Sequence, residues 1–426
     1  MGESTTPPQS RRRGGISSFG PAIIIAAVVL GPGSILANSK VGWQFGYDLV
    51  WVVVAAGVLL MSMTAMSARL GVFLDGTLCE ELARRGGRPL AAVTGVSLFL
   101  VAACFQFSNN LGVLLGIEPF LDGTALGDST WFTPTVLILL NLLVIAALFG
   151  FRQLYTPIEL LMKVLVGCML LGFVANLIFA RPSILKAVAG LVPRIPEGAG
   201  GSATSIIALV ATTFSVGGAF YQSYLVRQKG WGKGDLRQGL FDSIVGIGTL
   251  GCMSIVIMLT AAAALHGDKD ITELTSAADV ARQLRPLFGD VSTVLFCLGI
   301  FAGALSSFLV NAMIGGAALS DGLGFGSHVD GRWPKIFTAI ALIGGMLIAI
   351  SVKAAGFNTA NLIIFAQAVT VLGNPLLAGS MLWLATRPDL LEQKAVPRWM
   401  LALSVVGFLV VLVLSARTAY KIVGSF

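Results

Sequence analysis

The chain has 426 residues, of which 56% are hydrophobic and 12% are charged, and its mean hydropathy is +0.87. A soluble core cannot take up this much apolar surface, so the composition excludes a soluble globular protein and indicates an integral membrane protein. The formal net charge is +7, but the positive residues are spread through short polar segments and form no pattern for nucleic acid.

Apolar segments of membrane-spanning length recur from one end of the chain to the other, about eleven in all. They cover residues 19–43, 47–72, 89–115, 132–151, 157–180, 203–226, 236–266, 291–318, 333–354, 360–386 and 397–423. Residues 1–18 are polar and include Arg11-Arg12-Arg13, so we expect a disordered cytoplasmic tail there. Residues 19–426 are expected to form a single transmembrane domain.

Charge in the connecting loops predicts the orientation in the membrane. The loops after the second, fourth and sixth apolar segments are basic, and their positive residues are Arg84, Arg85, Arg88, Arg152, Arg227, Lys229, Lys233 and Arg237. The loop after the third segment is acidic and carries Glu118, Asp122 and Asp128. By the positive-inside rule, we expect a multi-pass protein of the plasma (inner) membrane with a cytoplasmic amino terminus. The long loop 267–290 would then lie outside, free to pack over the exit.

The first apolar segment is interrupted in its middle by Gly31-Pro32-Gly33. A helix cannot continue unchanged through this sequence, because proline lacks a backbone donor and clashes with the preceding turn. Two half-helices are therefore predicted. Freed backbone groups at membrane depth are tolerated where they face protein or line a solute cavity, so the break indicates a transport site or, alternatively, a packing kink.

A second interruption is predicted in the sixth segment, where Phe214 to Ala219 contains the paired glycines Gly217 and Gly218. Breaks five segments apart are typical of an inverted repeat whose two breaks meet near the membrane midplane. The repeats would be residues 19–180 and 203–386, with 397–423 as an added span. This pairing favours a solute site over a packing kink.

Candidate binding residues are polar groups at these breaks or within other spans. Ser34 and Ser215 are the first choices for substrate contact, with helix packing as the alternative. Asn109, together with Gly31, Gly217 and Asn374, completes the predicted binding set. Amides in lipid are costly and must face a cavity or form interhelical hydrogen bonds. A secondary polar cavity is predicted from Asn110, Gln222, Asn311, Gln367 and Thr370.

The remaining charged residues do not support a proton relay or an enzyme. We interpret Glu159 and Lys163 as a local ion pair, and Asp242 as a helix cap near the start of its span, with a proton relay as the alternative for Asp242. His266 and His328 are expected at span ends or in loops. The sequence contains no nucleotide loop, paired metal histidines or nucleophile motif, so neither an enzyme nor a cofactor is expected. The expected partners are an ion or small-molecule substrate and the bilayer, and nothing in the chain requires more than a monomer.

Several short motifs occur in a fixed order along residues 19–386. They are FGYDLVW (45–51), SARLGV (67–72), GFRQLY (150–155), ARP followed by GLVPRIP (180–196), FDS (241–243) and LFCLGIFAGALSS (295–307). Together they make the chain resemble the Nramp (natural resistance-associated macrophage protein) family of divalent-metal transporters. The resemblance implies an all-α, LeuT-like inverted-repeat fold with broken spans 1 and 6, and divalent metal cations as the inherited substrate class.

The family's metal-binding motifs are changed in this chain. The first-span motif Asp-Pro-Gly-Asn corresponds to Gly31-Pro32-Gly33-Ser34, and the sixth-span motif Met-Pro-His corresponds to Ser215-Val216-Gly217. A second histidine corresponds to Gln222, and the acidic residues of the third span fall among the uncharged residues 105–109. The resemblance therefore places the ligand positions at Gly31, Ser34, Ser215 and Gly217.

Three functions remain open on this basis. Without anionic, sulfur or imidazole ligands we expect no high-affinity manganese or iron binding, and a metal ion that passes should stay largely hydrated, as magnesium prefers. Alternatively, the larger neutral pocket carries a small organic solute. The third alternative is a transport-dead sensor or scaffold, which the retention of both costly breaks disfavours.

Overall fold

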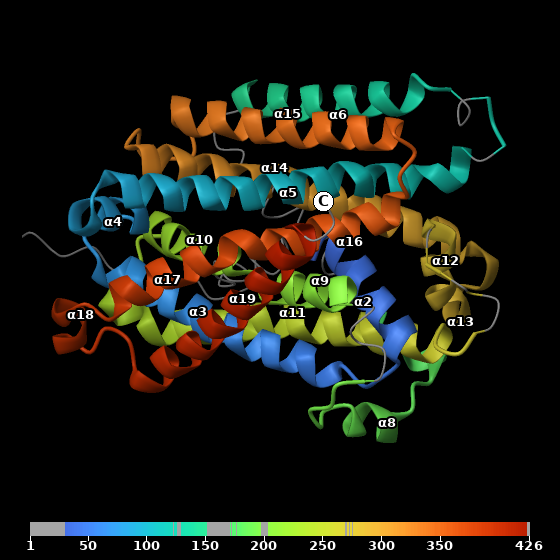
Figure 1. The fold of residues 1–426 in the computed structure, drawn as a ribbon, viewed down its shortest axis with the longest axis horizontal. Coiled ribbons are helices and arrows are strands. Elements are labelled where there is room, and N and C mark those ends of the chain that lie inside the picture. Colours follow the sequence, from blue (N-terminus) through green and yellow to red (C-terminus); the bar gives the residue numbers. More distant parts are fainter. Residues whose placement is uncertain are drawn as a thin grey trace, which may run out of the picture.

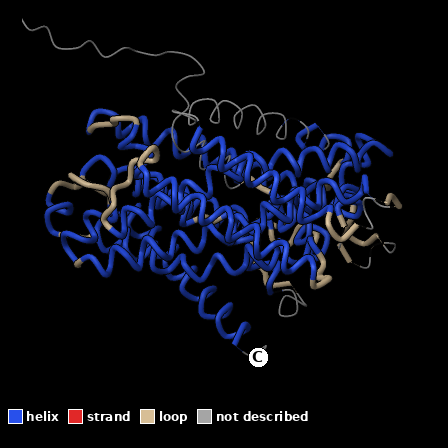
Figure 2. The backbone as a smooth tube through the Cα atoms, turned by 90° about the horizontal axis from the view of Figure 1, so that it is seen from above, coloured by secondary structure: helices blue, strands red, loops and turns tan. Residues whose placement is uncertain are grey.

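The computed structural model describes residues 30–121, 123–125, 129–150, 171, 173–175, 177–196, 203–268, 271, 273–274 and 276–423. Within these residues the chain forms helices joined by turns, and no strand occurs (Figures 1 and 2). This confirms the predicted all-α fold. The first half of the first span, residues 151–155 of the GFRQLY motif, and the pair Glu159 and Lys163 lie outside the described residues.

Nine helical segments of the described residues are long and apolar enough to cross a membrane, and they coincide with the second to fourth and sixth to eleventh predicted spans. The helices up to residue 189 are α2 (Pro32–Phe45), α3 (Val50–Phe73), α4 (Leu78–Gly86), α5 (Arg88–Leu121), α6 (Phe132–Gly150) and α8 (Ile184–Ala189). Those that follow are α9 (Ala203–Thr213), α10 (Val216–Gln228), α11 (Leu236–Ala264), α12 (Ala277–Ala281), α13 (Arg285–Phe288), α14 (Ser292–Leu323), α15 (Arg332–Ala354), α16 (Thr359–Thr370), α17 (Asn374–Ala385), α18 (Pro388–Glu392) and α19 (Arg398–Val423).

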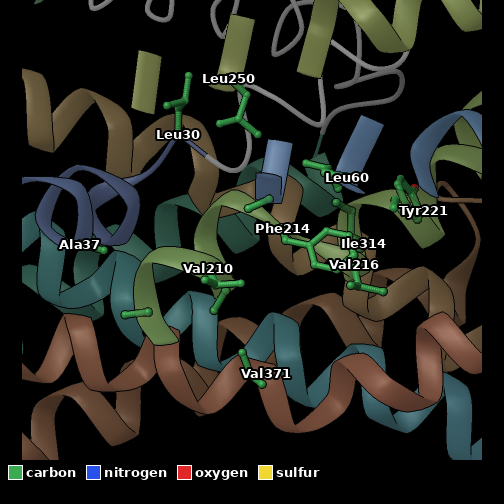
Figure 3. Close-up of a cluster of buried hydrophobic side chains, with 14 of the residues drawn as sticks. Leu30, Ala37, Leu60, Val210, Phe214, Val216, Tyr221, Leu250, Ile314 and Val371 are labelled. Carbon is green, nitrogen blue, oxygen red and sulfur yellow. The ribbon is translucent and has the colours of Figure 1, made fainter. Parts of the chain in front are cut away.

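Both predicted interruptions coincide with a helix boundary in the described residues. Helix α2 begins at Pro32 with Gly31 as its N-cap, and α9 and α10 are separated by Phe214 and Ser215. The second break thus lies within the predicted segment Phe214 to Ala219, and Gly217 and Gly218 lie in the first turn of α10. The glycine at 217 serves close packing, since a Cβ there would lie 2.8 Å from Leu98 Cδ1 of α5. Figure 3 shows Phe214, which belongs to the interruption, and Val216, at the start of α10.

The tenth span also changes helix type in its middle. Helix α16 ends at Thr370, a 3-10 turn covers Val371–Gly373, and α17 follows from Asn374. The local disruption predicted around Asn374 is thus confirmed. In the seventh span, Asp235 occupies the N-cap position of α11 and Asp242 lies inside the helix, so the prediction that Asp242 is a cap is wrong.

The long helices pack as two groups. Helices α5, α6, α14 and α15 form one group, α2, α3, α10 and α11 form the other, and α16 contacts α5 and α9 between them (Figure 1). We call the end of the bundle that holds α4 and α18 the α4 end, and the opposite end, with α8, α12 and α13, the α8 end. The positive residues of the loops predict that the α4 end is cytoplasmic.

Glycines let α5 and α14 approach each other closely. A Cβ at Gly95 would lie 2.6 Å from the backbone oxygen of Ala318, and a Cβ at Gly315 would lie 2.5 Å from Ala102 Cβ. Small residues at such crossings are the usual basis of helix packing in membranes, where backbones approach through van der Waals contact. These glycines fix the α5–α14 group against which the broken helices pack.

We expect Gly315→Ala to destabilise the protein by about 1–3 kcal/mol, because the added methyl group overpacks the α5–α14 crossing. Gly299→Ala on the same helix is the matched control, since a Cβ at Gly299 meets nothing within 4 Å. The measurement is the thermal denaturation midpoint of each purified variant in detergent. Equal midpoints for the two variants would contradict the close approach of the helices.

Candidate functional site

The first break packs between α5 and α14. Pro32 packs directly against Gly112 of α5, at a distance that leaves no room for a side chain at 112. A Cβ at Gly31 would lie 3.1 Å from Ser307 Oγ of α14 and 3.5 Å from Asn109 Oδ1 of α5. A side chain at position 31 would therefore point at a hydroxyl and an amide, both of them neutral.

The other side of the break is covered by α16. Gly33 packs against the side chain of Gln367, whose Nε2 donates a hydrogen bond to Ser108 Oγ over 2.8 Å. We call Gly31, Gly33, Asn109, Ser307 and Gln367 the central site. All five residues are buried. Gly31 and Gly33 lie at the break, and the other three come from α5, α14 and α16.

Buried polar atoms without hydrogen-bond partners occur at and beyond this site. In the central site these are Asn109 Nδ2 and Gln367 Oε1, and elsewhere they include Asn311 Nδ2 and both amide atoms of Gln222. An unsatisfied buried polar group costs about 1–3 kcal/mol, so such groups call for a partner such as water or a ligand. The central site thus offers both a donor and an acceptor to a solute.

Two helix starts at the breaks are left without side-chain caps. Helix α2 begins after Gly31 and α10 after Ser215, and neither N-cap residue makes a side-chain capping hydrogen bond. Helix α9 ends at Thr213, and the last carbonyl groups of a helix have no partner within it. The breaks therefore present amide donors at two helix starts and carbonyl acceptors at one helix end.

Ser34 and Ser215 both lie next to the breaks, as predicted, and both are buried. The Ser34 hydroxyl accepts from Asn38 Nδ2 at 3.3 Å, within its own helix. Asn374 is also buried, at the start of α17. Gly217 faces Leu98 and not a polar group, so the structure does not bring it to the central site.

Two residues of the predicted secondary cavity have local hydrogen-bond partners instead. Asn110 Nδ2 donates to Gln106 O at 2.8 Å, and Asn110 Oδ1 accepts from Asn141 Nδ2 of α6 at 2.8 Å. This favours the interhelical alternative over the cavity for Asn110. Thr370 Oγ1 donates to the backbone oxygen of Gln367 at 2.6 Å, within its own helix.

Sequence reasoning missed Ser307 and Ser108. Ser307 belongs to one of the short motifs in the eighth span, and it lies four residues before Asn311, which places both on one face of α14. That spacing of two polar residues in a membrane helix was the signal that could have identified it. Ser108 had no comparable signal, because its role depends on Gln367 from a distant helix.

Polar contacts close the α8 end above α2. Ser39 Oγ accepts a hydrogen bond from Gln283 Nε2 at 2.9 Å, and Lys40 Nζ donates to Asn361 Oδ1 of α16 at 2.7 Å. Gln283 lies in the loop 267–290, so the part of this loop that the structure describes does pack over the bundle. His266 and His328 lie outside the helices, as predicted.

No metal-binding cluster of the usual kind exists in the described part of the chain. No three histidine, cysteine, aspartate or glutamate side chains there are grouped so that they could hold a metal ion. The four positions at which the resemblance implies metal ligands carry two glycines and two serines. Any ion at the central site would meet amide, hydroxyl and backbone oxygen atoms.

A multi-pass helical bundle with two interrupted spans, whose breaks meet buried polar groups, defines a membrane protein of the secondary-transporter class. The model of the family "Natural resistance-associated macrophage protein-like" matches residues 22–421. The chain therefore belongs to the Nramp family, as its motifs indicated.

Relatives and solved structures agree with this assignment. The chain is 27% identical over 423 residues to the divalent metal cation transporter MntH of Deinococcus radiodurans, covering 98% of this chain and 91% of that protein. It is 26% identical over 414 residues to the protein of the same name from Yersinia pestis, covering 96% and 95%.

Among solved structures, a mutant of the Eremococcus coleocola manganese transporter superposes with a TM-score of 0.78 at 16% identity, covering 98% of this chain and 89% of that one. A nucleobase-cation-symport-1 family transporter superposes with a TM-score of 0.55 at 14% identity, covering 96% and 93%. At these identities the structures establish the fold alone, which is the predicted LeuT-like transporter fold.

The neighbours Asn109 and Asn110 should separate binding from stability. Asn110→Ala removes the hydrogen bond between α5 and Asn141, whose Nδ2 keeps only its bond to Leu137 O, so we expect a loss of about 1 kcal/mol of stability with little change in solute affinity. Asn109→Ala removes an amide with an unpaired Nδ2, so stability should be kept while solute affinity changes. Thermal midpoints and divalent-cation uptake into proteoliposomes measure the two effects. A larger loss of stability in the Asn109 variant would contradict these assignments.

Proposed function

We propose that this chain carries divalent metal cations across the membrane by alternating access, and that the ion keeps most of its hydration water, as magnesium does. One observation carries the proposal: at the side-chain position of Gly31, where the family places a carboxylate, the nearest polar atoms are the neutral oxygen atoms of Ser307 and Asn109. The relatives' names support the class of substrate, since they are divalent metal cation transporters.

The donor set argues against binding of a dehydrated transition metal. Manganese and iron sites in proteins use carboxylate, imidazole or sulfur ligands, which repay the loss of hydration. Gly31, Ser34 and Ser215 supply none of these groups. Amide and hydroxyl oxygens could not replace the inner water shell of such an ion without a large loss of free energy.

A hydrated ion makes a different demand on the protein. Its water molecules point their hydrogen atoms outward, so they need acceptors at the distance of one water layer. Asn109 Oδ1 lies beside the break, and Gln367 Oε1 is buried without a partner. Magnesium loses its water reluctantly and is commonly bound through it, so neutral acceptors suit magnesium better than they suit manganese or iron.

A small organic solute is the second candidate, and the donors of the site favour it. The uncapped starts of α2 and α10 and the unpaired Asn109 Nδ2 present N–H groups, which suit an acceptor such as a carboxylate or carbonyl oxygen. Transport of either kind of solute would exclude a transport-dead scaffold.

Isothermal titration and proteoliposome uptake with magnesium and manganese test the proposal. For the unmodified protein we expect saturable magnesium flux with a dissociation constant on the order of 10⁻³ M, and no tighter binding of manganese. The variant Gly31→Asp, Ser34→Asn, Ser215→Met should gain roughly tenfold or more in manganese affinity, because it restores a carboxylate and a thioether.

The same triple variant with Gly31→Asn in place of Gly31→Asp is the matched control, since it adds the same volume without the charge. It should not gain manganese affinity. Micromolar manganese binding by the unmodified protein would show that the ligand argument is wrong. Absence of flux for both ions would move the assignment to an organic solute.

A further inference from the structure

A buried carboxylate, Asp321, lies at the α4 end of α14 and belongs to neither the central site nor any predicted one. Its side chain is 1% exposed. Oδ2 accepts hydrogen bonds from the Tyr224 hydroxyl at 2.6 Å and from Thr77 Oγ1 at 2.5 Å, while Oδ1 has no partner. We call Asp321, Tyr224 and Thr77 the Asp321 cluster.

The cluster joins both groups of helices at one point. Asp321 lies on α14, and Tyr224 lies on α10, the half-helix that follows the second break. Thr77 is the N-cap of α4, where its hydroxyl also accepts from the backbone N–H of Glu80 at 3.2 Å. The Tyr224 ring stacks on Tyr221 at 5.4 Å between centroids, which fixes the direction of its hydroxyl.

Helix α4 is a firm partner for this contact, because it is tied to the rest of the α4 end. Arg85 bonds Glu81 at 2.8 Å within α4 and Asp389 of α18 at 2.8 Å. The Arg85 hydrogen bond lowers the pKa of the Asp389 carboxyl. Movement of α10 away from α4 and α14 must therefore break the hydrogen bonds of the Asp321 cluster.

The charged groups around Asp321 do not neutralise it. The guanidinium of Arg88 on α5 donates to the backbone oxygens of Asp321 at 3.1 Å and Gly322 at 3.4 Å, not to the carboxylate. Glu80 and Cys79 on α4 are the other titratable neighbours, besides Tyr224 on α10, and Glu80 adds negative charge. A buried carboxylate held by two neutral hydroxyls, with one oxygen unpaired, is costly when charged and much less so when protonated.

We propose that Asp321 is a proton-binding site that controls the opening of the α4 end. With the proton bound, the neutral carboxyl stays buried and Tyr224 holds α10 against α4 and α14. Loss of the proton to water leaves a charge that favours hydration, so α10 separates and water enters. This proposal rests on alternating access, and it assigns proton coupling to a group outside the central site.

The chain carries its own reporter for this opening. Cys79 on α4 is 0% exposed, and its Sγ donates to the backbone oxygen of Ala318 on α14 at 4.0 Å. Burial, and then the negative charge of Asp321, raise the pKa of the Cys79 thiol, so the closed form is unreactive. Separation at the Asp321 cluster would expose this thiol to water.

The experiment measures alkylation of Cys79 by a membrane-impermeant maleimide between mildly acidic and mildly alkaline pH. The parent protein has Cys104, Cys168, Cys252 and Cys297 changed to alanine. The matched variant adds Asp321→Asn, which keeps an acceptor oxygen and cannot ionise. The general rise of the thiolate fraction with pH acts in both proteins, so the ratio of their rates reports what the Asp321 carboxylate adds.

We expect the ratio of parent to Asp321→Asn rates to rise roughly fivefold or more from acid to alkaline pH, the scale of ordinary coupling between sites. The direct effect of the Asp321 charge on the thiol would act in the opposite direction and cannot produce this rise. A ratio that stays constant with pH overturns the proposal.

Tyr224→Phe in the same parent is a second test that keeps the carboxylate and removes one hydroxyl. It should speed Cys79 alkylation at every pH, and an unchanged rate would count against the role of Tyr224. Neither measurement needs a solute. If the ratio of alkylation rates stays constant with pH while magnesium is transported, the proton site alone is overturned. If the ratio rises with pH but neither magnesium nor manganese is transported, the proton site is supported and cation transport is overturned.

Discussion

Backbone groups inside a membrane must find partners within the protein, and the two breaks are where this chain departs from continuous helix. Gly31-Pro32 and Phe214-Ser215 interrupt spans, and α5, α14 and α16 surround the first of these breaks. The close packing of Pro32 on Gly112, and of α5 on α14, gives the interrupted backbone a rigid wall. The fold can therefore keep unwound backbone at membrane depth, and the polar atoms that meet there form the central site.

The charge in this protein lies away from that site. The four implied ligand positions carry no carboxylate, thioether or imidazole, and the polar groups named beside the first break are the Ser307 hydroxyl and the amides of Asn109 and Gln367. The buried carboxylate Asp321 instead lies at the α4 end, bonded to the half-helix that starts at the second break. On our proposals, solute binding and proton binding are separated in space and connected through α10.

The sequence was sufficient for those features that depend on local composition. Hydropathy located the spans, Gly31-Pro32-Gly33 located the first break, and Gly373-Asn374-Pro375 located the irregular turn in the tenth span. It was not sufficient where the outcome depends on a distant neighbour. Gly217 packs on Leu98 of α5, a contact that the local sequence does not indicate.

The same limit applies to the polar residues of the site. Asn109 and Asn110 are adjacent and chemically identical, yet Asn110 is bonded to Asn141 while Asn109 faces Gly31. Ser307 and Asp321 were not singled out, because their importance comes from Gly31, Thr77 and Tyr224 in other helices. Periodicity assigns a residue to a helix, but partners separated by hundreds of residues are set by the packing of the whole bundle.

The neutral central site has a consequence for how membrane voltage acts on transport. A carrier that binds a divalent ion between carboxylates moves little net charge, whereas the groups around Gly31 offset none of the ion's charge. The loaded carrier would then move two elementary charges and the empty one none. One elementary charge that crosses the membrane gains about 2.3 kcal/mol per 100 mV, so the field contributes about 4.6 kcal/mol per 100 mV to the loaded step. For a divalent load the resting potential would thus be a direct driving force for entry.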